Sequence, residues 1–122
     1  RSSDLKLSKI ADILGAEVLC GKDHLDNDVE YAFSSDLMSD VLTYVNKRTL
    51  LLTGLTNAQV IRTAEMIDIA GVLFVRNKKL GDDILKLATE DDILVMRTCH
   101  TMYTASGILY CAGLKGLSIG RS

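Results

Sequence analysis

The sequence predicts one α/β domain in which helices cover both faces of a mostly parallel sheet, a three-layer α/β/α arrangement. Between residues 50 and 113, short apolar stretches alternate with stretches of helical periodicity, and the connections are a few residues long. The stretches VLFV (72–75) and ILVM (93–96) contain no polar residue, which is typical of strands buried on both faces. Such alternation favours parallel strands joined by right-handed crossovers. A length of 122 residues suits a single domain over the whole chain, with its core expected at about residues 5–113.

The N-terminal part predicts a helix, two strands and a strand–helix junction. A short helix is expected at 8–15, followed by strands at 16–21 and 29–35. The second of these strands alternates apolar and polar residues, which is the period of a half-buried strand. One of the two serines at its end is expected to cap a helix over 36–45.

The central stretch LLLTGLTNAQV contains the next junction. Leu50–Leu52 is expected to be a buried strand. Thr56 and Gln59 fit the capping-box pattern, in which each residue satisfies a free backbone N–H group of the other, and the helix is expected to end at Gly71. The remaining elements are expected in the order strand 72–75, helix 82–92, strand 93–96 and helix 102–111.

Composition argues against several classes of function. The formal net charge is −2 and the basic residues are scattered, whereas nucleic-acid binders usually carry a basic stripe. No apolar stretch approaches the roughly 20 residues that a membrane span needs, and no signal peptide is recognised. The three cysteines lack C-x-x-C spacing, so a reduced, cytoplasmic protein is expected.

The junctions between strands and helices are the expected place for a site. In open α/β sheets, ligands bind beyond the carboxyl ends of the strands, and helix starts there offer free N–H groups to an anion. Four loops are expected at that edge: 34–36, 53–57, 76–79 and 97–101. The candidate ligand-binding residues are Ser35, Asp36, Thr53, Gly54, Thr56, Arg76, Arg97, Thr98, His100 and Thr101.

Each of these residues also has a structural alternative. The serines and threonines can be helix caps only, and Gly54 can serve a tight turn. Asp36 can cap its helix, or hold Mg²⁺ beside a nucleotide. The two arginines can be solvated or paired with acids such as Asp91 and Asp92.

No motif of known phosphate loops or catalytic sites stands out. The chain contains neither G-x-x-x-x-G-K-[ST] nor G-x-G-x-x-G. Cys99 and His100 are chain neighbours whose side chains are expected to point apart, so they suit neither a catalytic pair nor a shared metal. His24 is expected to be solvated, and Cys20 and Cys111 to be small core residues. No catalytic residue, metal ligand or cofactor is assigned.

The chain resembles the DRTGG domain family over nearly its whole length, from about Leu5 to Gly113. The resemblance rests on LSKIADILGAEVLCG, SSDLMSDVL, LLLTGLTNAQVIRTAEMIDIAGVLFV and RTCHTMYTASGIL. The family is similar to the N-terminal domains of HPr kinase/phosphorylase and of MurF-type ligases. It also occurs beside CBS domains and in long phosphotransacetylases. The resemblance implies an α/β/α fold, a bacterial regulatory or ligand-sensing module of unknown ligand, a tendency to dimerise, and no established catalytic residues.

The motif positions of the family fall on particular residues of this chain. The acidic position falls on Asp36, and Thr-Gly falls on Thr53 and Gly54. Leu37 stands where the family has an arginine, and Leu55 stands at the second glycine. His100-Thr101 matches the late Asp-Thr. The missing arginine would remove a bidentate anion clamp.

The sequence is compatible with three functions. The first is a non-catalytic regulatory module, expected to be a homodimer, that binds a small anionic or nucleotide-like ligand at the junction loops. The second is an interaction module that binds a partner enzyme or its own copy without a small ligand, suggested by the apolar residues Leu109, Leu114, Leu117 and Ile119. The third, a phosphotransfer enzyme using Asp36 and a metal, lacks the phosphate loop and base that such chemistry needs.

Overall fold

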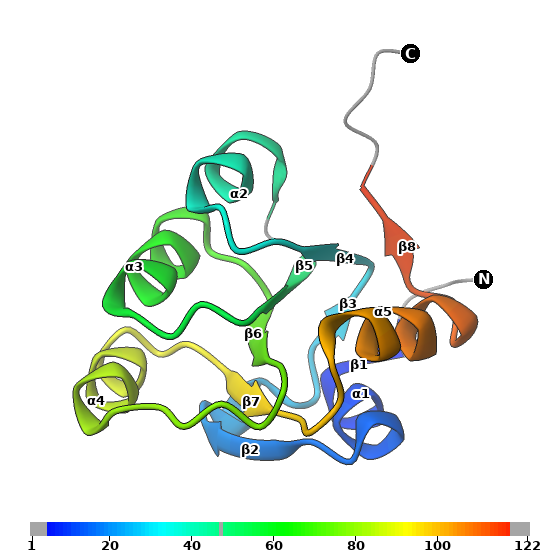
Figure 1. Ribbon diagram of the computed structural model, residues 1–122, viewed down its shortest axis with the longest axis horizontal. Helices are drawn as coiled ribbons and strands as arrows, with labels where there is room; N and C mark the ends of the chain where they lie inside the picture. Colours follow the sequence, from blue (N-terminus) through cyan, green and yellow to red (C-terminus); the bar gives the residue numbers. More distant parts are fainter. Residues whose placement is uncertain (1–4, 47, 118–122) are drawn as a thin grey trace.

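The computed structural model describes residues 5–46 and 48–117. Within these ranges the chain forms five α-helices and a six-stranded, mostly parallel sheet (Figure 1), which confirms the predicted α/β class. The helices are α1 (Leu7–Leu14), α2 (Met38–Tyr44), α3 (Ala58–Ile67), α4 (Asp82–Glu90) and α5 (Met102–Cys111). The strands of the sheet are β2 (Glu17–Cys20), β4 (Tyr31–Ser34), β5 (Thr49–Thr53), β6 (Gly71–Phe74), β7 (Val95–Arg97) and β8 (Lys115–Gly116). A separate two-stranded ladder joins β1 (Leu5–Lys6) to β3 (Asp28–Val29).

The strand order places the central junctions at one edge of the sheet. The order is β2-β7-β6-β5-β4-β8, and β4, β5, β6 and β7 are mutually parallel. Their carboxyl ends therefore meet at one edge, which we call the carboxyl edge. Strand β2 pairs with β7 in the antiparallel direction, and β8 adds in parallel beside β4.

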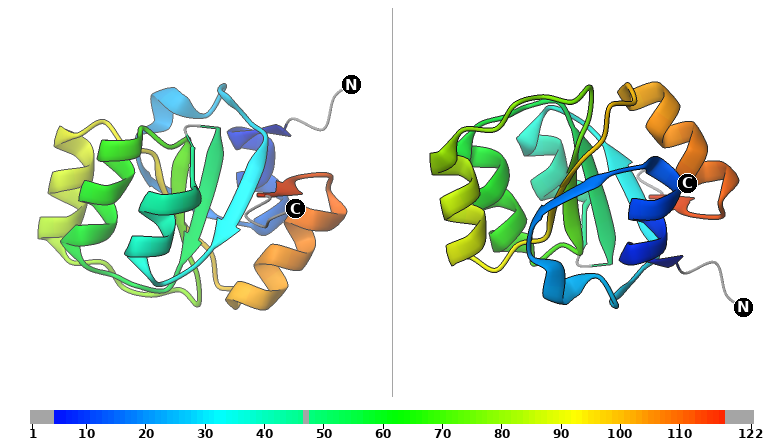
Figure 2. Two further views of the ribbon diagram at one scale, coloured as in Figure 1. Left: turned by 90° about the horizontal axis from the view of Figure 1, so that it is seen from above. Right: turned by 90° about the horizontal axis from the view of Figure 1, so that it is seen from below.

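The sheet is covered on both faces, as Figure 2 shows. Helices α2, α3 and α4 pack on one face, and α1 and α5 pack on the other. Strand β5 lies at the centre and alternates between the two: Leu51 belongs to the first core, and Leu50 and Leu52 belong to the second. All three leucines are fully buried, which explains the unbroken apolar run in the sequence.

The first predicted junction is wrong in detail. The strand expected at 29–35 is divided, because Val29 pairs with Leu5 in β3 whereas β4 begins at Tyr31. Helix α2 begins at Met38 without any side-chain cap, so neither Ser34 nor Ser35 caps it. Instead, Ser35 Oγ accepts a hydrogen bond from the Leu37 N–H, and the Leu37 side chain is 58% exposed.

The second predicted junction is also corrected. The Thr56–Gln59 capping box is absent, because Asn57 takes the cap position and its side chain accepts a 3.0 Å bond from the Gln59 N–H. Asparagine is among the strongest helix caps. The helix ends at Ile67, and Gly71 begins β6 instead of ending α3. No helix in the described ranges is long and apolar enough to cross a bilayer.

Candidate functional site

The junction loops are bonded to one another in pairs at the carboxyl edge. Asp36, after β4, accepts hydrogen bonds through Oδ1 from Thr53 Oγ1 (2.9 Å), at the end of β5, and from the Gly54 N–H (2.8 Å), just after that strand. After β6, the Arg76 N–H donates to the His100 carbonyl (2.8 Å), and the next N–H donates to the Thr98 carbonyl (2.7 Å). The Val75 N–H donates to the Thr53 carbonyl (3.1 Å) and joins the two pairs, so four segments that are distant in sequence form one continuous rim.

The Thr53-Gly54 turn is occupied by a side chain of the protein itself. Thr53 is fully buried, and its hydroxyl donates to Asp36 while it accepts a 3.1 Å bond from the Leu55 N–H. The pKa of Asp36 is lowered, first because the Gly54 N–H bonds its ionised form. Partial burial opposes this shift, and the Thr53 hydroxyl and the charges of Arg76 and Lys78 add to it. An external anion therefore does not find the Gly54 N–H free.

Arg76 lies beside the same turn. A Cβ atom placed on Gly54 would stand 3.0 Å from Arg76 Nη2 and 3.8 Å from Asp36 Oδ1. Arg76 is exposed at φ 62° and the next residue has φ 52°; this left-handed pair is held by the two backbone bonds to the loop after β7. Within residues 5–46 and 48–117, the Arg76 guanidinium makes no hydrogen bond and no ion pair.

Arg97 does not join this cluster. It is the last residue of β7, and its Nη2 forms a 2.6 Å ion pair with Glu17 Oε1 on β2. Because β2 and β6 lie on opposite sides of β7, this contact is directed away from Arg76. The alternative that this arginine pairs with an acid is therefore confirmed, but the acid is Glu17 and not Asp91 or Asp92.

The other candidate residues after β7 have structural contacts. Thr98 is buried, and its hydroxyl donates a 3.0 Å bond to the Leu14 carbonyl at the end of α1. Thr101 caps α5 by accepting a 3.4 Å bond from the Thr104 N–H. His100 takes part through its backbone carbonyl, and its ring is half-buried. Thr56, partly buried, stands one residue before the cap of α3.

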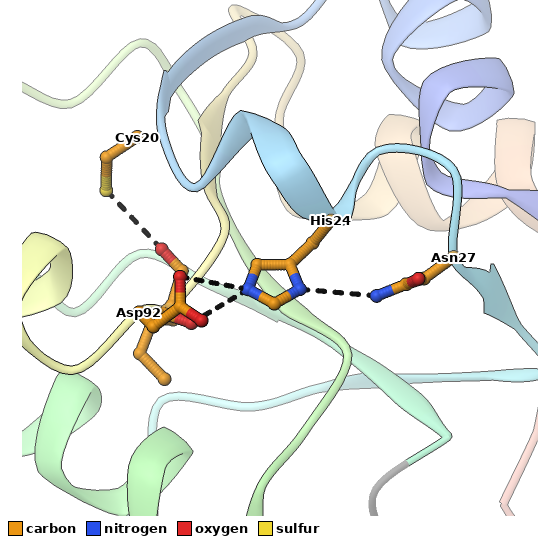
Figure 3. Close-up of polar contacts among 5 residues, drawn as sticks. Cys20, His24, Asn27 and Asp92 are labelled. Carbon is orange, nitrogen blue, oxygen red and sulfur yellow. Dashed lines mark hydrogen bonds and ion pairs between the residues drawn. The ribbon is translucent and has the colours of Figure 1, made fainter.

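A hollow of about 450 Å³ lies at the opposite edge of the sheet, where sequence reasoning placed nothing. It is lined by His24, Asn27, Asp28, Arg48, Glu65, Asp68, Ile69, Ala70, Asp91, Asp92, Ile93 and Leu94. His24 is not simply solvated: its Nε2 lies 3.1 Å from the Asp92 carbonyl oxygen and 3.2 Å from Asp92 Oδ1, and its Nδ1 lies 3.2 Å from Asn27 Nδ2 (Figure 3). Carboxylates at the ends of α3 and α4 make this hollow unfavourable for an anion.

The cysteines differ in their surroundings. Cys20 is partly buried and donates to the Ile93 carbonyl at 3.4 Å (Figure 3), and burial raises the pKa of its thiol. Cys111 is exposed, so the prediction that it is a core residue is wrong. No group of three His, Cys, Asp or Glu side chains within the described part of the chain is placed to hold a metal.

The fold and the rim define a small α/β/α domain with polar groups gathered at the carboxyl edge of a mostly parallel sheet. Residues 9–111 match the family model of the DRTGG domain. The chain belongs to the DRTGG domain family, which confirms the predicted resemblance.

A solved structure shares the fold. It contains the CBS and DRTGG domains of the regulatory region of Clostridium perfringens pyrophosphatase, complexed with the activator diadenosine tetraphosphate. The two chains are 16% identical with a TM-score of 0.70, and the match covers 89% of this chain and 47% of that one. This chain therefore spans about half the length of that neighbour, in which a DRTGG domain is part of a regulatory region. Among curated proteins, none matches this chain.

Proposed function

We propose that this domain is a non-catalytic regulatory module that binds a small anionic, nucleotide-like ligand at the carboxyl edge. The observation that carries the proposal is Arg76, whose guanidinium lies beside Gly54 without a hydrogen bond or ion pair in the described ranges. Lys78 is near enough to lower the pKa of Asp36 together with it. The activator of the neighbouring pyrophosphatase region, diadenosine tetraphosphate, is a ligand of this chemical kind.

The charges of the domain favour an anion at the carboxyl edge over an anion in the hollow at the opposite edge. A guanidinium presents N–H donors in a planar fork that matches two oxygens of a phosphate, and an ammonium nearby adds a point charge. Arg97 and Arg48, in contrast, are already paired with Glu17 and Glu30. The proposal assigns no catalytic step to Asp36, because its Oδ1 is bonded to Thr53 and Gly54 and no group of three His, Cys, Asp or Glu side chains in the described ranges is placed to hold a metal.

The proposal predicts that Arg76→Ala weakens binding of adenosine diphosphate by about tenfold or more, since a charge-assisted contact is worth about 1.5–3 kcal/mol. Titration calorimetry measures the affinity, and thermal unfolding checks that the fold is kept. Arg62→Ala is the matched control, because Arg62 is an exposed arginine on α3. Equal affinities for wild type and Arg76→Ala would contradict the proposed site.

A second candidate function is homodimerisation through α5, and the exposed tyrosines of that helix favour it. Tyr103 and Tyr110 are 90% and 76% exposed, and no Asp, Glu, Lys or Arg occurs from Thr98 to Leu114. Gly107, between the tyrosines, has open space where its Cβ would stand. Such an uncharged surface is typical of a protein contact.

The residues that first suggested an interaction surface do not form one. Leu109 and Leu114 are buried in their own domain, Leu117 packs against the core of α2–α4, and Ile119 lies outside the described residues. The dimer proposal rests on α5 instead.

If α5 forms the dimer contact, Tyr103→Glu and Tyr110→Glu convert the protein to a monomer in analytical ultracentrifugation, because each places a charge in an apolar interface. Met66→Glu, on the exposed side of α3 (70% exposed), serves as control. A wild type that sediments as a monomer at all concentrations tested would refute the contact.

A cytoplasmic location stays a prediction from the cysteine pattern.

A further inference from the structure

We propose that the ligand of the carboxyl edge carries a sugar hydroxyl group as well as a phosphate, and that Asp36 accepts a hydrogen bond from this hydroxyl while Arg76 binds the phosphate. The ligand class is then a ribonucleotide or another sugar phosphate, rather than a bare inorganic anion. This inference rests on the proposed function, because it assigns a further requirement to the same site.

The Asp36 carboxylate is held in a fixed orientation and leaves one oxygen available to a ligand. Its Oδ1 accepts from both Thr53 and the Gly54 N–H, and these two bonds fix the plane of the carboxylate. No hydrogen bond to Oδ2 occurs in residues 5–46 and 48–117, and the residue is exposed. An ionised carboxylate oxygen is an acceptor only, so Oδ2 offers a fixed acceptor to a donor that comes from solution.

The same carboxylate disfavours a simple anion. Its negative charge lies near the guanidinium and ammonium that would attract a phosphate, and it uses the backbone N–H that a phosphate would otherwise take. Inorganic phosphate or pyrophosphate therefore meets one repulsive group among the attractive ones. A ligand that adds a hydroxyl donor turns this repulsive contact into a charge-assisted hydrogen bond.

Gly54 supplies an independent reason to place both contacts on one ligand. It is not among the glycines with positive φ, so its backbone does not require glycine. A Cβ there would press against Arg76 Nη2 at 3.0 Å and would lie close to Asp36 Oδ1. The absent side chain thus leaves room for the Arg76 guanidinium against the same turn whose Gly54 N–H holds the Asp36 carboxylate.

The test compares four probes on the wild-type protein by titration calorimetry: adenosine diphosphate, its 2′,3′-dideoxy analogue, ribose 5-phosphate and pyrophosphate. We expect the dideoxy analogue to bind about tenfold or more weakly than adenosine diphosphate, because a charge-assisted bond is lost. Ribose 5-phosphate binding as well as adenosine diphosphate would assign the site to sugar phosphates in general. If ribose 5-phosphate bound more weakly than adenosine diphosphate, the site would be assigned to nucleotides. Both outcomes are consistent with the hydroxyl requirement.

Asp36→Asn gives the second arm. The amide keeps an oxygen for Thr53 and Gly54 but replaces Oδ2 by a donor, so the preference for adenosine diphosphate over its dideoxy analogue should fall to about onefold, while pyrophosphate binds equally or more tightly. Equal binding of the two nucleotides to wild type would overturn the inference and leave the proposed function in place. If none of the four probes bound wild type, the proposed function itself would fail. The wild-type comparison needs no variant, so it decides the matter even if Asp36→Asn does not fold.

Discussion

Gly21→Ala is expected to destabilise the domain by about 3–5 kcal/mol, combining the cost of a left-handed alanine with that of overpacking. Gly21 follows β2 at φ 79°, and a Cβ there would stand 2.5 Å from Leu94 Cα and 2.7 Å from the Ile93 carbonyl oxygen. Both neighbours are backbone atoms, so no side-chain rotation relieves the overlap. Thermal unfolding should show a midpoint lowered by about 10 °C or more for a domain of this size.

Gly15→Ala separates the two causes. Gly15 ends α1 with a similar φ of 58°, but nothing lies within 4 Å of its Cβ position. Its replacement should therefore cost only the left-handed conformation, about 1–2 kcal/mol. If the two variants lost equal stability, the close approach of Gly21 to the backbone of Ile93 and Leu94, just before β7, would be contradicted.

Phe74→Ala is expected to cost about 3–5 kcal/mol in urea unfolding, the range observed when a buried aromatic ring is truncated. Phe74 is fully buried at the end of β6, on the face covered by α2, α3 and α4. Phe74 pairs in register with Thr53 on β5 and Arg97 on β7. The cavity left by the missing ring would therefore lie next to the junction loops of the carboxyl edge.

The control for this variant is Met66→Ala on α3. Met66 is 70% exposed, so its truncation should change the free energy of unfolding by no more than about 0.5 kcal/mol. A Phe74→Ala protein as stable as Met66→Ala would mean that the assignment of the core face of β6 is wrong.

The bounds of helices and strands could be predicted from the sequence where the pattern of buried apolar residues determines them. Helix α5 begins and ends at the residues expected from its periodicity, Met102 and Cys111, and the apolar stretches at 72–75 and 93–96 contain most of β6 and most of β7. The start of α2 and the division of β3 from β4 could not be read in this way. They depend on contacts with distant segments, such as the Glu30 N–H bonded to the Arg48 carbonyl.

The candidate site, too, could be predicted only in part from the sequence. The rule that parallel strands end at one edge was enough to bring Asp36, Thr53, Gly54 and Arg76 into one group. It could not show that Asp36 already fills the turn, because helix caps, metal ligands and turn bonds all suit an aspartate. Nor could it pair Arg97 with Glu17, which is 80 positions away on an antiparallel strand.

The two margins of the sheet have a consequence for the behaviour of the protein in concentrated solution. A sheet margin with free N–H and carbonyl groups invites strands of other molecules to add, and bulges, short strands and lysines discourage this. Here β2 changes register between Val18 and Cys20, and β8 on the other side is two residues long and begins with Lys115. Neither margin offers a long, flat template, so the domain is built to resist edge-to-edge aggregation.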